Sequence, residues 1–263
     1  DDLICLLFDD VPSTGEDMAA VQLLLCDIVK QHCPGHKLII CPSYYSTDPV
    51  LEQVFGPRPS DYWQTLGDGL AEEIGFFWTG DVVCSRHYTV DNLQLIAEKF
   101  SRKPILWDNY PVNDGAKMSR YLHLEPRQHD ANLAELTDGH FANPMNQAYL
   151  SQLPLAGLAD GYVLPDENSR HESAQVIKRS EQSSPLSQLL DSKPFLYEKL
   201  GSALAQRLVE DAEAFQLRGL DQLSLAEKAT LVERYRHFDS PYAKEVVDWL
   251  EDRYPFDPAC LTD

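Results

Sequence analysis

Five short apolar runs recur along the first 160 residues, and segments with helical periodicity lie between most of them. The runs begin roughly 35 residues apart, which is about the length of one βα unit. Repeated βα units predict a parallel sheet, which is either doubly wound or closed into a barrel. The predicted strands cover residues 3–8, 36–41, 74–78, 104–107 and 139–142.

The residues that follow the predicted strands distinguish these two architectures. In an open doubly wound sheet, only the strands beside the switch point need polar or special residues at their ends. In a (β/α)₈ barrel, every strand end faces one common site, so five such ends favour a TIM-type barrel. No GxGxxG or GxxxxGK[ST] motif lies at a strand–helix turn, which weakens a nucleotide-binding interpretation. The five strand ends with polar or special residues are 9–10, 42–45, 79–80, 108–110 and 143–144.

The pattern changes beyond about residue 165. Residues 166–184 are mostly polar, and helical periodicity dominates from Pro185 onward. We therefore predict two regions, a barrel region over 1–165 and an α-helical C-terminal region over 166–263 that serves for packing and not for chemistry. The predicted helices are 15–31, 50–55, 61–70, 89–100, 145–156, 185–190, 195–217, 224–238 and 242–254.

Two helices carry further local signals. In helix 15–31, the residues Met18, Val21, Leu24, Leu25 and Ile28 are spaced to form one apolar face. Helix 89–100 opens with a capping pattern at its first residue, a threonine followed three positions later by a polar residue.

The chain is strongly acidic, with 42 acidic and 22 basic residues and a formal charge of −20. This charge argues against nucleic acid and against an anionic membrane as partners, although excess acid is more often a solubility feature. No apolar run approaches the roughly 18 residues that a membrane-spanning helix needs. The sequence makes no prediction of an oligomeric state.

The six cysteines form no CxxC pair, and most lie within or beside apolar runs. This predicts reduced and mostly buried thiols, not disulfides, which slightly favours a cytoplasmic location. A zinc site would need tighter clustering of cysteine and histidine, so we expect no metal and no cofactor.

Two adjacent carboxylates, Asp9 and Asp10, follow the first apolar run. Their mutual repulsion should push their two pKa values apart, so that one stays ionised while the other keeps a proton. A glycosidase needs this combination: a proton donor for the leaving oxygen and a fixed negative charge near the developing cation. The pair could equally cap the next helix or bind a metal.

The other strand ends supply aromatic rings together with amide and carboxylate groups. Such a set suits a sugar, because its C–H faces stack on aromatic rings and its hydroxyls pair with amides and carboxylates. Each residue also has a structural interpretation: Trp78 and Trp107 could be core aromatics, and Asn143 before a proline could form a turn. The residues at or near the strand ends that would suit a sugar are Tyr44, Tyr45, Trp78, Trp107, Asn109, Asp114 and Asn143.

Five strings, in this order, resemble glycoside hydrolase family 84, the O-GlcNAcase-type β-N-acetylglucosaminidases. The resemblance covers roughly residues 1–165. The strings are Leu-Leu-Phe-Asp-Asp (6–10), Cys-Pro-Ser-Tyr-Tyr (41–45), Trp-Thr-Gly (78–80), Leu-Trp-Asp-Asn-Tyr-Pro-Val-Asn-Asp (106–114) and Asn-Pro-Met (143–145).

The resemblance implies a retaining, substrate-assisted hydrolysis of terminal β-linked N-acetylglucosamine, including O-GlcNAc on protein Ser/Thr. In the family's pattern, the 2-acetamido carbonyl of the substrate attacks the anomeric carbon and forms an oxazoline. Asp9 would hold the acetamido N–H, and Asp10 would act as general acid and then as general base. The implied partner is a glycan or glycoprotein that carries N-acetylglucosamine.

The resemblance also implies five substrate-binding residues. Tyr45 would hydrogen-bond the acetamido group. Trp107 would form the aromatic wall of the acetamido pocket, which Asn109 would also line. Asp114 would accept the outer hydroxyls of the sugar, and Asn143 would contact a hydroxyl or the acetamido group.

The resemblance places residues 3–8 at the fourth barrel strand, so the first three strands are expected to lie outside this chain. The family's Gly-rich loop and lysine that grip the sugar have no match here, and Glu125 stands where the family usually has glycine. A non-catalytic N-acetylglucosamine- or glycoprotein-binding module is the alternative. A metal-dependent hydrolase that uses Asp9, Asp10 and Asp114 is a second alternative.

Overall fold

The computed structural model describes residues 2–12, 15, 17–127, 133–162, 184–258 and 260. The chain forms two compact units: unit 1 lies within Asp1–Asp108 and His129–Ala142, and unit 2 lies within Asn109–Gln128 and Asn143–Asp263. The predicted boundary near residue 165 lies outside the described residues and stays a prediction. None of the helices in the described ranges has the length and apolar character needed to span a bilayer.

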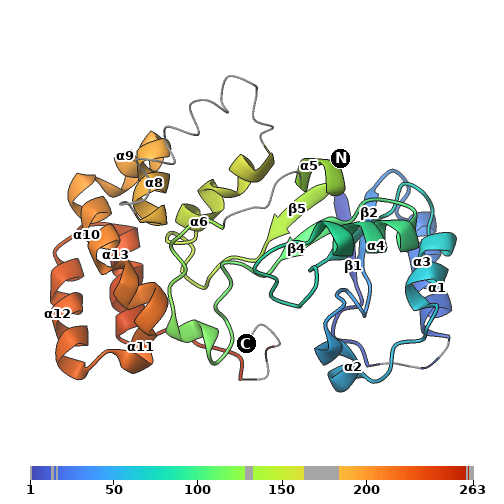
Figure 1. Ribbon diagram of the computed structural model, residues 1–263, viewed down its shortest axis with the longest axis horizontal. Coiled ribbons are helices and arrows are strands. Elements are labelled where there is room, and N and C mark those ends of the chain that lie inside the picture. The colour runs from blue at the N-terminus through green and yellow to red at the C-terminus, as the bar shows by residue number, and fades with distance from the viewer. Residues whose placement is uncertain are drawn as a thin grey trace. The chain divides into compact units, whose positions relative to one another are not determined.

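Unit 1 is built on five parallel strands whose order in the sheet is their order in the chain (Figure 1). All five predicted strands are confirmed, with ends that differ by at most one residue. The strands are β1 Leu3–Leu7, β2 Lys37–Cys41, β3 Gly75–Trp78, β4 Ile105–Asp108 and β5 Gly139–Ala142.

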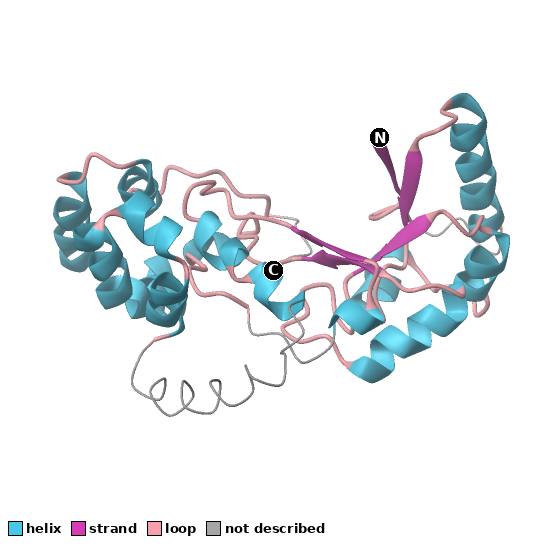
Figure 2. Cartoon of the chain, turned by 90° about the horizontal axis from the view of Figure 1, so that it is seen from above, coloured by secondary structure: helices cyan, strands magenta, loops and turns pink. Residues whose placement is uncertain are grey.

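Helices α1, α3 and α4 lie side by side on one face of this sheet (Figures 1 and 2). Phe76 of β3 stacks on Phe100 of α4 with ring centroids 3.9 Å apart. The predicted cap of α4 is confirmed, because the Thr89 side chain accepts a hydrogen bond from the backbone N–H of Asn92. The helices of unit 1 are α1 Met18–His32, α2 Pro49–Phe55, α3 Tyr62–Gly69, α4 Val90–Phe100 and α5 Leu133–Leu136.

The apolar face predicted for α1 is largely exposed in the described part of the chain. Met18 is buried, but the other four residues of the predicted face are 40–59% exposed: Val21, Leu24, Leu25 and Ile28. The buried residues of the helix are Met18, Ala19, Gln22 and Cys26. The Gln22 amide nitrogen donates to Ser43 Oγ at 2.8 Å, and its amide oxygen accepts from Tyr62 Oη at 2.6 Å. This buried polar network orients the helix.

The second face of the sheet, here called the open face, is defined by alternate residues of each strand. Glycines next to Ile105 on this face leave room for the Ile105 side chain. A Cβ atom at Gly75, for example, would lie only 2.7 Å from Ile105 Cδ1. Exposed apolar side chains on this face include Leu3, Leu7 and Phe141, at 43–45% exposure. The open-face residues are Leu3, Cys5, Leu7, Lys37, Ile39, Cys41, Gly75, Phe77, Ile105, Trp107, Gly139 and Phe141.

The cysteines form no disulfide, as predicted, but the expectation that most are buried is wrong. Only Cys26 and Cys41 are buried, whereas Cys5 is exposed. Cys5 is exposed because it lies on the open face of β1, where apolar neighbours on the same face are exposed as well.

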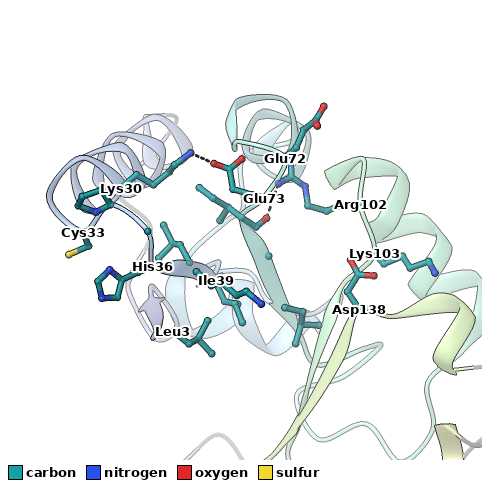
Figure 3. A pocket seen from close by; sticks show the side chains of 17 residues that line it. Leu3, Lys30, Cys33, His36, Ile39, Glu72, Glu73, Arg102, Lys103 and Asp138 are labelled. Atoms are coloured by element: carbon teal, nitrogen blue, oxygen red, sulfur yellow. Dashed lines mark hydrogen bonds and ion pairs between the residues drawn. The ribbon is translucent and has the colours of Figure 1, made fainter. Parts of the chain in front are cut away.

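A cavity of about 860 Å³ opens at the amino ends of the strands, where charged residues of both signs lie around apolar ones (Figure 3). Lys30 pairs with Glu73 at its rim. The Arg102 guanidinium at this end of the sheet donates to carbonyl oxygens of Gly67, Leu70, Ala71 and Ile74 at 2.6–3.3 Å. Arg102 therefore satisfies backbone carbonyls at and just beyond the end of α3.

Arg102→Lys is expected to lower the free energy of unfolding by about 2 kcal/mol, because one ammonium group cannot reach the carbonyls that the planar guanidinium bridges. Urea denaturation measures the change. Lys103→Arg, the reverse exchange at the exposed neighbouring residue, is the matched control and should change stability by less than about 0.5 kcal/mol. Equal stability of both variants with the wild type would contradict this role of Arg102.

Unit 2 is helical around a core that includes Phe215, Tyr235 and Trp249. The Trp249 indole donates to the Ser119 carbonyl at 3.0 Å, which ties the segment after β4 to the last helix. The elements are η1 Met118–Arg120, α6 Gln152–Ala156, η2 Leu158–Tyr162, α8 Pro185–Ser192, α9 Pro194–Leu200, α10 Ser202–Glu213, a π-helical turn at Ala214–Arg218, α11 Gly219–Gln222, α12 Leu225–Arg236 and α13 Pro241–Leu250.

The predicted helical character from Pro185 onward is confirmed, but two of the predicted helices of unit 2 are corrected. The helix predicted over 195–217 is divided at Gly201, whose φ of 75° is a left-handed conformation that an α-helix does not continue through. The helix predicted over 145–156 begins only at Gln152, after a turn in which the Ser151 hydroxyl donates to the Gln147 carbonyl at 2.8 Å.

Candidate functional site

The strands of unit 1 are parallel, so the residues that follow them leave the sheet at one edge. Asp9 and Asp10 follow β1, Tyr45 follows β2, and Trp107 lies near the end of β4. Asn109 and Asn143 come next in the chain after β4 and β5 and, with Asp114, belong to unit 2. The candidate residues of each unit are therefore described separately.

The two adjacent carboxylates form a tight turn that is anchored to the next strand. The backbone N–H of Phe8 donates to the Cys41 carbonyl at 2.9 Å, and the Ser43 hydroxyl donates to the Phe8 carbonyl at 2.6 Å. Asp10 then adopts a φ of 57°, in the left-handed region that non-glycine residues seldom occupy. Conformations of this kind cost about 1 kcal/mol or more and cluster at functional sites.

Tyr45 connects the turn to the end of β2. Its hydroxyl donates a long hydrogen bond of 3.4 Å to Asp10 Oδ1, and the side chain is buried. Burial, followed by the negative charge of Asp10, raises the pKa of Tyr45 well above its ordinary value. Tyr45 is therefore a neutral hydrogen-bond donor at physiological pH.

The Asp9 carboxyl is partly buried, and its Oδ1 has no hydrogen-bond partner within the described part of the chain. Burial raises the pKa of Asp9, a backbone hydrogen bond opposes this, and the Asp10 charge adds a smaller increase. The sequence predicts charge repulsion as the reason for a shifted pKa in this pair. In the structure, loss of hydration contributes more than the neighbouring charge.

Trp107 is half-buried on the open face, and its ring meets Phe77 edge to face, with centroids 5.0 Å apart at 90°. Trp78, which the sequence also offers as a sugar-stacking residue, is fully buried on the other face. Its indole donates to Asn92 Oδ1 at 2.8 Å, so Trp78 is a core aromatic. Tyr44 is buried as well, and its hydroxyl donates to the Gly56 carbonyl at 2.6 Å.

Three candidate residues lie in unit 2. The Asn143 amide nitrogen donates to Asn109 Oδ1 at 3.4 Å, so the residues that follow β4 and β5 in the chain contact each other. Asp114 is held by the C-terminal segment: its carbonyl accepts from the backbone N–H of Asp257 at 2.7 Å, and its Oδ1 accepts from Cys260 Sγ at 3.5 Å.

Asn113 is a residue whose role the sequence pattern did not reveal. It is buried, and its amide nitrogen donates to Gln147 Oε1 at 2.8 Å and to the Tyr121 carbonyl at 3.0 Å. Its Oδ1 accepts from the backbone N–H of Asn146. Asn113 therefore ties the segment after β4 to the segment after β5, next to Asn143 and Asp114 in the chain.

In the described ranges of the chain, no group of three or more His, Cys, Asp or Glu side chains is arranged to hold a metal ion. The candidate residues themselves carry carboxylate, phenol, amide and indole groups. Such groups can position a polar, uncharged ligand and move one proton.

The family model described as beta-N-acetylglucosaminidase matches residues 3–189. The chain is 26% identical over 118 residues to Protein O-GlcNAcase of Rattus norvegicus and of Mus musculus, which covers 41% of this chain and 13% of each relative. A solved mutant of the Thermobaculum terrenum O-GlcNAc hydrolase is similar in fold, with a TM-score of 0.62 and 28% identity over 95% of this chain. The chain covers 57% of that structure's length.

Proposed function

The chain belongs to the beta-N-acetylglucosaminidase family, and from this premise we propose that it carries the catalytic residues of a β-N-acetylglucosaminidase. The proposed reaction is hydrolysis of terminal β-linked N-acetylglucosamine. O-GlcNAc on serine and threonine of proteins is the proposed substrate, because the relatives are named for it. The proposal concerns the whole protein, since the chain spans only part of these relatives.

The observation that carries the proposal is the turn at Asp9 and Asp10. It presents two carboxylates at the carboxyl edge of a parallel sheet, in a left-handed conformation at Asp10, with a buried tyrosine donating to one of them. A half-buried carboxylate with an unused oxygen and a second carboxylate beside it provide a fixed acceptor and a group that exchanges a proton.

The proposed mechanism uses the substrate's own nucleophile. The acetamido carbonyl oxygen forms a bond to the anomeric carbon as the glycosidic bond breaks, and Asp10 transfers its proton to the leaving oxygen. The resulting oxazoline is opened by a water molecule whose proton returns to Asp10. The acetamido N–H becomes more acidic as the ring closes, so the Asp9 carboxylate binds the transition state more strongly than the substrate.

The remaining candidate residues have proposed roles in binding. Tyr45, as a neutral donor beside Asp10, would hydrogen-bond the acetamido group. Trp107 would form the wall of the acetamido pocket with the part of its ring that Phe77 does not cover, and Asn109 would line the same pocket. Asp114 would accept the outer sugar hydroxyls, and Asn143 would contact a hydroxyl or the acetamido group.

We also propose that the sheet is part of a (β/α)₈ barrel over residues 1–165, followed by the helical region 166–263. The uninterrupted order β1 to β5 is the order of barrel strands, and the exposed apolar open face fits a barrel interior that further strands would cover. The first three strands would lie outside this chain. Slow amide exchange in β1 of a protein with all eight strands, and fast exchange in this chain alone, would support the proposal.

The function is tested by hydrolysis of an aryl β-N-acetylglucosaminide by the protein with its complete barrel. We expect the first sugar released to be the β-anomer, as observed by NMR, and inhibition by a thiazoline that mimics the oxazoline. First release of the α-anomer would contradict the retaining mechanism. Thiazoline binding without hydrolysis would favour the binding-module alternative, and loss of activity with chelators would favour a metal-dependent hydrolase.

A further inference from the structure

Asp108 and His140 form a buried pair between β4 and β5. His140 Nε2 lies 3.1 Å from Asp108 Oδ2, and the two side chains are only 4% and 1% exposed. The Tyr88 ring packs edge-on to the imidazole, with centroids 6.1 Å apart. A carboxylate buried to this degree is costly unless it is hydrogen-bonded, so the pair strongly constrains the geometry of both strands.

The pair lies on the opposite face of the sheet from Trp107. Successive side chains of a strand alternate between faces, so Trp107 and Phe141 face the open side while Asp108 and His140 face the helices. Trp107 is in register with Phe141, and Phe77 meets both of their rings edge to face. The ends of β4 and β5 are therefore joined by a polar contact on one face and an aromatic cluster on the other.

The backbone ladder pairs β4 with β5 from Ile105 to Asp108, and the aromatic contacts place the Trp107 ring against Phe77. The hydrogen bond between Asp108 and His140 is directional, and it adds a side-chain restraint between β5 and the residue next to Trp107. A shift of the β4 end would move the Trp107 ring together with its backbone.

We propose that Asp108 and His140 are a positioning pair that sets the place of Trp107, and through it the size of the N-acyl group that the site accepts. This inference rests on the proposed function, which assigns Trp107 to the acetamido pocket. Neither residue of the pair contacts the sugar in this proposal.

The test compares kcat/KM for aryl glucosaminides that carry an N-acetyl or an N-butyryl group, in the protein with its complete barrel. His140→Leu removes both ring nitrogens and should reduce the N-acetyl preference by about tenfold, the scale of selectivity that a fitted apolar pocket provides. His140→Gln keeps a donor and should retain the preference within about twofold. His36→Leu, at a partly exposed histidine of the same unit, should leave it unchanged.

A folded His140→Leu variant with wild-type N-acyl preference would overturn the inference, and so would an equal loss in His36→Leu. If His140→Leu does not fold, the double variant Asp108→Asn, His140→Leu is tested instead, because it removes the buried charge together with its partner. Its ratio of kcat/KM for the N-acetyl and N-butyryl substrates is compared with the wild-type ratio in the same way. Failure of the wild-type protein to hydrolyse the N-acetyl substrate would instead contradict the proposed function.

Discussion

Asp10→Asn is expected to lower kcat for an alkyl N-acetylglucosaminide by about 1,000-fold, because the amide cannot give a proton to the leaving oxygen or take one from water. The loss should be much smaller in the bond-breaking step for a dinitrophenyl leaving group, which departs without a proton. Pre-steady-state release of the aryl group, compared with steady-state kcat for the alkyl substrate, measures this difference.

Asparagine is the informative replacement at this position. Asp10 has a φ of 57°, and asparagine tolerates the left-handed region better than alanine does, so the turn should keep its shape. Its side-chain oxygen can still accept the Tyr45 hydrogen bond. Asp252→Asn is the matched control, since Asp252 shares the φ of 57° and its carboxylate is exposed, paired with Arg120. Undiminished activity in Asp10→Asn would remove Asp10 from the acid/base role.

Much of unit 1 could be predicted because its strands are short apolar runs with abrupt polar ends. Apolar periodicity, however, does not reveal which face a neighbour covers. The α1 helix shows this, since four of its five periodic apolar residues are exposed, whereas Gln22 is buried in a network with Ser43 and Tyr62. The division at Gly201 was equally hidden, because a glycine within a helical pattern is compatible with either outcome.

The candidate site was predictable as a set of residue types at strand ends, but not in its contacts. Trp78 and Trp107 both lie near a strand end and look alike in the sequence. The alternation of side chains along each strand places Trp78 against Asn92 and Trp107 on the open face. Asp108 and His140 are separated by 32 residues, and no local pattern indicates that they meet. The raised pKa of Asp9 depends mainly on the burial of its carboxyl group, which is a tertiary property.

Asp9→Ala is expected to lower kcat by about 100- to 1,000-fold, the usual loss when one preorganised group that stabilises the transition state is removed. Ring closure precedes or accompanies departure of the leaving group, so good and poor leaving groups should be slowed alike. This uniform loss distinguishes Asp9 from Asp10. A loss confined to poor leaving groups would assign proton donation to Asp9 and contradict the proposed division of roles. Removal of a partly buried carboxylate with an unpartnered oxygen should not reduce stability by more than about 1 kcal/mol.

The pH dependence of kcat/KM gives an independent reading of Asp9, because this parameter reports groups of the free enzyme. The proposed role needs the ionised carboxylate, so kcat/KM should fall as the pH falls through the pKa of Asp9. Burial raises that pKa, so the acidic limb should lie at higher pH than for an ordinary aspartate. The limb should disappear from the residual activity of Asp9→Ala and persist in Asp252→Asn. An acidic limb that is unchanged in Asp9→Ala would belong to another group, and the carboxylate at Asp9 would then not be the one that steadies the closing ring.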